Sequence, residues 1–231
     1  MRPSVRARFL EFTAPLEGVV RWMYLDVKGL VTTGYGNLID SPETALEPGW
    51  RNAKGGYASR DEVLCEWNRV KSNTALAKAG HWAAEKVTNL RLDDEEVEKL
   101  VYRVLDTMNA ELVEAYPAFE EWPADAQLAT LAMAWACGPA FGTRGKSPFR
   151  GLHKSLLAGD FKAASQQCTI NAKGNPGVIP RNKAMRQLYF LAAAGFDFEV
   201  SWPIDESVRK WQEAAGLVAD GLVGPKTLAA L

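Results

Sequence analysis

The stretch LEGVVRWMYLDVKGLVTTGYGN, residues 16–37, joins a helical pattern to a strand pattern and decides how the N-terminal part of the chain folds. The helical pattern begins near Ser4, an expected N-cap, and ends near Glu17 and Gly18, where a glycine can stop a helix. Pro15 either kinks the last turn of this helix or begins a new short one.

The second half of the stretch predicts a β-hairpin. Residues 23–36 are dominated by Val, Thr and Tyr, which favour strands, and the tetrapeptide DVKG at residues 26–29 has the composition of a turn. A turn at Val27–Gly29 would bring Asp26 and Thr32 near one another across the antiparallel ladder. The glycines that follow would let a ligand approach the backbone closely.

Two carboxylates, Glu17 and Asp26, therefore flank the hairpin. Hydrolysis of a glycosidic bond needs one carboxylic acid to protonate the leaving oxygen and a second carboxylate that acts on water or on the sugar carbon. Both residues also have an ordinary interpretation, because a glutamate near a helix end is usually solvated and an aspartate at a turn usually bonds locally. On chemistry alone, the ordinary interpretation is favoured.

Most of the remaining chain carries helical periodicity, and the fold class is mainly α with one small hairpin near the N-terminus (α+β). Ser59 and Glu62 form a capping-box pattern at the start of one helix. The helix within Pro123–Pro139 is apolar nearly all round, so it is expected at the centre of the core. Residues 41–56 are expected to be a loop. The other expected helices cover residues 91–112, 148–157, 161–168 and 180–194.

Composition limits the classes of partner and cofactor. The chain has 231 residues, 47% of them hydrophobic, and a formal net charge of −1, so no basic field favours nucleic acid or an anionic membrane. It shows no signal peptide and no apolar run long enough for stable membrane insertion. The three cysteines are far apart and predict reduced thiols, and the two histidines form no metal-binding pattern. No cofactor and no metal are expected.

The pattern E-G-x5-Y-x-D-x2-G-x2-T-x-G-Y-G-N resembles the phage-type lysozymes of glycoside hydrolase family 24. The resemblance implies that Glu17 is the general acid, that Asp26 stabilises developing positive charge or helps to activate water, and that Thr32 positions this water. It also implies a two-lobed lysozyme-like catalytic domain with a small N-terminal β-hairpin lobe, over residues 1–195. Residues 38–88 are longer than is usual in this family.

Three further residues are candidates for substrate contact by the same resemblance: Tyr35, Asn37 and Arg181. Asn37 stands where the family usually has histidine, and Arg181 matches a family arginine near the acid. Tryptophans could also stack on sugars, but most of those in this chain are expected to belong to the core.

The pattern V-R-K-W-Q-x3-G-L-x3-G-x2-G-P-x-T-L-x2-L, beginning at Val208, resembles the closing half of peptidoglycan-binding modules of three short helices. The resemblance implies a small C-terminal helical module over residues 203–231 that binds the bacterial wall. The alternative is a pair of helices that completes the fold.

Together the two resemblances imply a monomeric endolysin that hydrolyses the β-1,4 bond between N-acetylmuramic acid and N-acetylglucosamine and causes lysis. Its partner would be bacterial peptidoglycan, reached from the host cytoplasm through a separate pore that opens to the periplasm and cell wall. The alternatives are a virion-associated or secreted antibacterial lysozyme, a lytic transglycosylase and a non-catalytic wall-binding protein.

Overall fold

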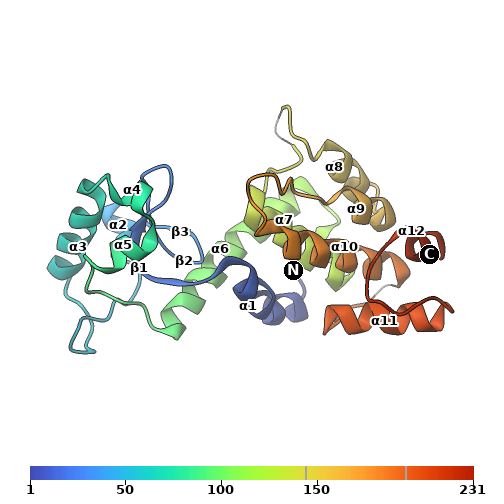
Figure 1. Ribbon diagram of the computed structural model, residues 1–231, viewed down its shortest axis with the longest axis horizontal. Coiled ribbons are helices and arrows are strands. Elements are labelled where there is room, and N and C mark those ends of the chain that lie inside the picture. Colours follow the sequence, from blue (N-terminus) through green and yellow to red (C-terminus); the bar gives the residue numbers. More distant parts are fainter. Residues whose placement is uncertain (144, 196) are drawn as a thin grey trace. The chain divides into compact units, whose positions relative to one another are not determined.

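The computed structural model describes residues 1–143, 145–195 and 197–231. The chain is mainly helical with one small antiparallel sheet, as the sequence predicts (Figure 1). It divides into two compact units, of which unit 1 contains Met1–Leu16 and Leu105–Leu231 and unit 2 contains Glu17–Val104. The boundary falls within helix α6 (Asp94–Ala115). In the described parts of the chain, no helix has the length and apolarity needed to cross a bilayer.

Unit 2 is built around the sheet, whose strand order is β1-β2-β3. Its strands are β1 (Val20–Leu25), β2 (Val31–Gly34) and β3 (Asn37–Leu38). Its short helices are α2 (Pro42–Ala45), α3 (Arg60–Ser72), α4 (Leu76–Ala79) and α5 (His81–Glu85).

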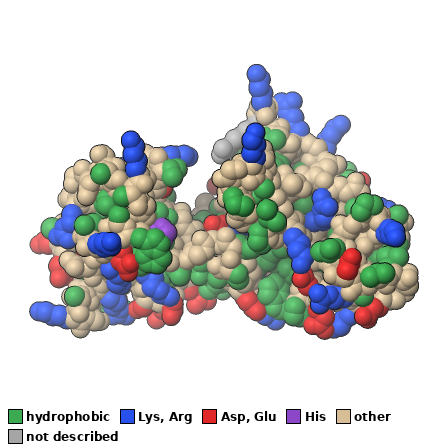
Figure 2. Space-filling model, viewed as in Figure 1, with side chains coloured by type: hydrophobic (Ala, Val, Ile, Leu, Met, Phe, Trp, Pro, Cys, Tyr) green, Lys and Arg blue, Asp and Glu red, His purple; other side chains and the backbone are tan. Residues whose placement is uncertain are grey.

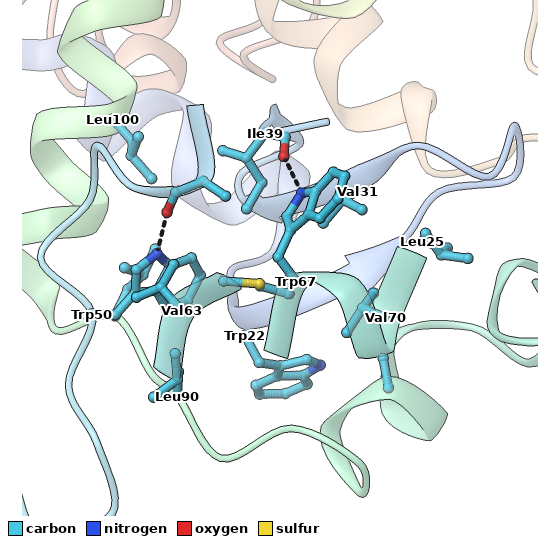
Figure 3. Packing of buried hydrophobic residues seen from close by; sticks show 14 of the residues in the cluster. Trp22, Leu25, Val31, Ile39, Trp50, Val63, Trp67, Val70, Leu90 and Leu100 are labelled. Atoms are coloured by element: carbon cyan, nitrogen blue, oxygen red, sulfur yellow. Dashed lines mark hydrogen bonds between the residues drawn. The ribbon is translucent and has the colours of Figure 1, made fainter. Parts of the chain in front are cut away.

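The core of unit 2 contains three tryptophans with little exposed surface, Trp22, Trp50 and Trp67 (Figure 3). The indole N–H of Trp50 donates to the carbonyl of Ala45 at 2.8 Å, and that of Trp67 donates to Ile39 at 2.8 Å. The apolar rings are thus buried while their single polar group stays satisfied. Trp122 of unit 1 is buried as well, whereas Trp82 is exposed and Trp135, Trp202 and Trp211 are half-buried. Four of the eight tryptophans therefore belong to the core, fewer than the majority that was expected.

Unit 1 is helical in all its described regular elements. Besides most of α1 (Pro3–Glu17), it contains η1 (Phe119–Glu121), α7 (Ala124–Cys137), α8 (Arg150–Leu157), α9 (Phe161–Gln167), α10 (Val178–Ala194), α11 (Ile204–Ala214) and α12 (Pro225–Ala229). Every residue of α7 from Ala124 to Ala134 is buried, which confirms the expected central helix. Gly138 is the C-cap of α7, and glycine can adopt its φ of 81° without strain.

Several predicted boundaries differ from the structure by a few residues, among them the starts of α6, α8 and α10. Helix α1 begins at Pro3, so Ser4 is not its N-cap; the Ser4 hydroxyl donates instead to the carbonyl of Phe198 at 2.8 Å. The helix continues through Pro15 and ends at Glu17, where its end was predicted. Strand β1 begins at Val20, before the predicted residue 23, because Val20 pairs with Gly34 beyond an irregularity in the ladder.

The predicted loop at residues 41–56 contains the short helix α2. Ser41 caps it by accepting the N–H of Thr44, while the Thr44 hydroxyl accepts the N–H of Ser41 in return. Pro42 at the first helical position favours the same start. The predicted capping box of α3 is confirmed, because Ser59 and Glu62 make the equivalent reciprocal bonds.

Candidate functional sites

The hairpin between β1 and β2 turns at Val27–Gly29, as predicted. Asp26 organises this turn, since its Oδ1 accepts the backbone N–H of Lys28 at 2.8 Å and of Leu30 at 2.9 Å. The backbone N–H of Asp26 also donates to the Leu30 carbonyl at 2.9 Å. Among the described residues, no donor reaches Oδ2. One oxygen of the carboxylate therefore holds the turn and the other is available to a ligand.

Thr32 lies directly opposite Tyr24 in the β1–β2 ladder, and Leu25 lies opposite Val31. Residues paired in this way project from the same face of the sheet. Side chains alternate along a strand, so the face that carries Thr32 and Tyr24 also carries Asp26. The Thr32 hydroxyl donates to the Leu30 carbonyl at 3.1 Å, and its side chain is only 4% exposed.

Glu17 is the last residue of α1 and carries an exposed side chain. Gly18 follows with a φ of 70°, which turns the chain from the helix into β1 at Val20. Burial raises the pKa of Tyr24 above its ordinary value, and the negative charges of Asp26 and Glu17 raise it further. Both carboxylates must lie near the Tyr24 hydroxyl to act in this way. Within unit 2, Thr32 is therefore the ladder partner of Tyr24, and Asp26 and Glu17 lie within electrostatic range of the hydroxyl of that tyrosine.

Tyr35 lies in the turn between β2 and β3, and Asn37 is the first residue of β3. Asn37 Oδ1 accepts the backbone N–H of Tyr35 at 3.0 Å, and its Nδ2 donates to the carbonyl of Leu100 in α6 at 3.3 Å. Burial raises the pKa of Tyr35, while Arg21 lowers it and Asp94 raises it. Asn37 thus joins the turn to α6, and a substrate contact for either residue stays a prediction.

Arg181 lies in α10 of unit 1 and is almost fully buried. Its Nη1 donates to the carbonyl of Ala132 in α7 at 3.0 Å. Burial raises the pKa of the Cys137 thiol, and the positive charge of Arg181 lowers it. The structure thus gives Arg181 partners on α7, and its predicted role toward substrate remains a prediction.

A second candidate site lies in the C-terminal segment, where Gln212 is a buried hydrogen-bond centre. Its Nε2 donates to Asp220 Oδ1 at 3.0 Å, to the Leu222 carbonyl at 3.0 Å and to Thr227 Oγ1 at 3.1 Å. Its Oε1 accepts the backbone N–H of Gly221 at 2.9 Å. One amide therefore joins α11, the loop after it and α12.

Helix α10 packs against this segment through both polar and aromatic contacts. Gln187 Nε2 donates to Asp205 Oδ1 at 2.7 Å and to the Gly221 carbonyl at 2.6 Å. Phe190 meets Trp211 edge to face, with ring centroids 4.7 Å apart. The second half of α10, α11 and α12 thus form one packed group of three helices.

A groove of about 590 Å³ opens on this three-helix group. Val218 and Leu222 are among its walls and are 82% and 53% exposed. The carboxylate of Asp220 and the ammonium of Lys226 also line it. The groove therefore offers apolar surface with one charge of each sign. Over the face drawn in Figure 2, acidic and basic side chains are likewise interspersed.

The sequence did not indicate these groove residues. The sequence has an Asp-Gly pair at residues 220–221 that is typical of a turn, but the exposure of Val218 and Leu222 is known only from the structure. The sequence signal that could have indicated the groove is the pair of apolar residues, Val218 and Leu222, on either side of this turn. Within the described residues, no group of three or more His, Cys, Asp or Glu side chains is placed to hold a metal.

Comparison with known families identifies the C-terminal segment. Residues 183–231 match the family described as "Putative peptidoglycan binding domain". The match begins within α10, earlier than the predicted start at residue 203, and covers the whole three-helix group. No curated protein matches the chain. The chain thus carries a peptidoglycan-binding domain in residues 183–231, with bacterial peptidoglycan as its partner, and is a cell-wall-associated protein.

Proposed function

We propose that the protein is a muramidase, which hydrolyses the β-1,4 bond between N-acetylmuramic acid and N-acetylglucosamine in the wall that its C-terminal domain binds. The observation that carries this proposal is that Glu17, Asp26 and Thr32 all lie near Tyr24. These three residues provide the two carboxylates and the hydroxyl that the resemblance to family 24 lysozymes implies for catalysis. We further propose an endolysin as the biological setting.

The chemistry assigns one step to each residue. Glu17 gives its proton to the leaving glycosidic oxygen as that bond breaks. The Thr32 hydroxyl already donates its hydrogen to Leu30, so it can only accept, and a water that donates to it is held by one O–H. That water attacks the sugar carbon and passes its other proton to the free Oδ2 of Asp26. Backbone donors at Oδ1 keep this carboxylate in one orientation.

The C-terminal domain would hold the enzyme on its insoluble substrate. Binding through a second site raises the effective concentration of glycan near the catalytic residues without any new contact at the bond that is cleaved. Loss of wall binding should therefore lower activity on whole sacculi far more than activity on soluble glycan fragments.

The test is cleavage of purified peptidoglycan by wild type, Glu17→Gln and a matched control. We expect Glu17→Gln to lose at least about a hundredfold in rate, because a positioned general acid contributes about 10²–10⁴-fold. Glu98→Gln is the control, since Glu98 is an exposed carboxylate on α6 of the same unit, and it should keep wild-type activity. Mass spectrometry should find reducing ends, whereas 1,6-anhydro ends would assign a lytic transglycosylase.

A non-catalytic wall-binding protein is the second candidate. It is favoured by the structural role of Asp26, whose Oδ1 bonds would be needed in the hairpin even without catalysis. It is also favoured by the family match, which covers the binding domain alone. For this candidate, wild type and Glu17→Gln would both bind walls and neither would release muropeptides.

A further inference from the structure

Unit 2 carries an aromatic cluster that includes Tyr24. It is formed by Trp22 and Tyr24 of β1 with His81 and Trp82 at the start of α5. The ring centroids of His81 and Trp82 are 4.8 Å apart, and Trp82 lies 5.6 Å from Trp22. The indole N–H of Trp22 donates to the His81 carbonyl at 2.8 Å, which fixes α5 against the strand.

Trp82 is the exception among the tryptophans of this unit, because its side chain is 64% exposed. Trp22, which supports it, is buried and lies at the lower edge of the side chains drawn in Figure 3. The rings of Trp22 and His81 contact the indole of Trp82 and support it, while much of its surface faces solvent. In the described chain, no acceptor pairs with its Nε1–H. A large aromatic surface held in one orientation loses little entropy when a ligand packs on it.

The cluster is continuous with the candidate catalytic residues. The ring centroids of His81 and Tyr24 are 6.1 Å apart, and the charges of Glu17 and Asp26 act on the hydroxyl of that same tyrosine. His81, which contacts Trp82, and the two carboxylates are therefore neighbours of the same tyrosine. The pair His81–Trp82 also belongs to the 38–88 segment, which is longer than usual in the family that the hairpin resembles.

We propose that Trp82, supported by His81, is a saccharide-binding subsite on which one pyranose ring of the glycan strand stacks beside the bond that is cleaved. The ligand class rests on the proposed function. The C–H face of a pyranose is apolar and matches an indole in size, and the free Nε1–H can donate to a hydroxyl or an N-acetyl oxygen at the ring edge. Substrate is thereby positioned by a residue that takes no part in the proton transfers.

The test compares Trp82→Ala, Trp82→Phe and the control Tyr57→Ala. Tyr57 is 65% exposed in the same unit, where its ring lies under the guanidinium of Arg51. On soluble glycan strands we expect Trp82→Ala to raise KM about three- to tenfold with kcat little changed, the range expected for one aromatic contact. Trp82→Phe should recover most of this loss, and Tyr57→Ala should show none. Equal KM values for all variants, or a fall in kcat alone, would overturn the proposal.

A binding measurement separates this proposal from the proposed function. Calorimetric titration with a soluble oligomer of N-acetylglucosamine, in a Glu17→Gln background, should show the same loss of affinity for Trp82→Ala. If wild type cleaves nothing but this loss is observed, the subsite stands and the muramidase proposal fails. If wild type cleaves walls and the affinities are equal, the subsite fails alone. A change in sedimentation without a change in affinity would identify a self-association surface instead and would also overturn it.

Discussion

Asp125 makes stability depend on pH in a direction opposite to that of most carboxylates. It lies in the first turn of the buried helix α7 and is almost fully buried. Its Oδ1 accepts the backbone N–H of Ser201 at 2.8 Å, and its Oδ2 accepts the Ser201 hydroxyl at 2.6 Å. Burial raises the pKa of Asp125 to about 6, the bonds from Ser201 lower it in part, and the charge of Asp197 adds to the rise.

The direction follows from which state binds the proton more tightly. Between about pH 4 and pH 6 the folded protein keeps this carboxyl protonated while the unfolded chain has released the proton, so the free energy of unfolding falls as pH rises. Above about pH 6 the loss is complete. The difference between the ordinary value of 3.8 and about 6 corresponds to about 3 kcal/mol, at about 1.36 kcal/mol per pKa unit.

Asp125→Asn removes the charge and keeps an oxygen that can accept the N–H of Ser201. Urea unfolding of wild type and variant near pH 4 and near pH 7.5 measures the effect, because the other groups titrate alike in both proteins. We expect the stability of the variant relative to wild type to rise by about 2–3 kcal/mol between the two pH values. Ser201→Ala should enlarge the pH-dependent loss in an otherwise wild-type chain. Parallel curves for wild type and Asp125→Asn would refute the reasoning.

Two further substitutions test the hairpin and the C-terminal domain. Gly34→Ala should destabilise the protein by about 1–3 kcal/mol in thermal or urea unfolding, because φ is 62° there and a Cβ would lie 2.5 Å from Asn37 Oδ1. Gly145→Ala is the control, since a Cβ added there meets open space. Equal stabilities of the two variants would contradict the packing argument. Gln212→Leu should abolish co-sedimentation of the protein with purified sacculi, since Asp220, Leu222 and Thr227 lose their shared hydrogen-bond partner. The variant should still cleave soluble glycan. Retained wall binding would show that the groove does not depend on the Gln212 amide.

The hairpin turn and the start of α3 could be predicted because their causes are local. Asp26 bonds to backbone groups within four residues, and Ser59 bonds to Glu62 three residues away. Both arrangements depend on short-range side-chain chemistry that a sequence displays directly. The burial of α7 was likewise predictable, since a helix apolar on every side has no face suited to water.

Features that depend on distant parts of the chain were not predictable. Ser4 resembles an N-cap, yet its hydroxyl bonds to Phe198, which is 194 residues away in sequence. The exposure of Trp82 depends on how α5 packs against β1. Composition and periodicity carry no information on such long-range contacts.

The packing of α10 against α11 limits how this chain can exchange parts with other wall proteins. A recombination point near residue 203 would separate Gln187 and Phe190 from Asp205 and Trp211, leaving a polar amide and a ring without their partners on one fragment. The transferred fragment would also lack the first of its three helices. Chimaeras joined ahead of α10, in the loop near residue 175, should carry the binding domain intact. The segment that must be transferred as a whole is therefore longer than the sequence motif that begins at Val208.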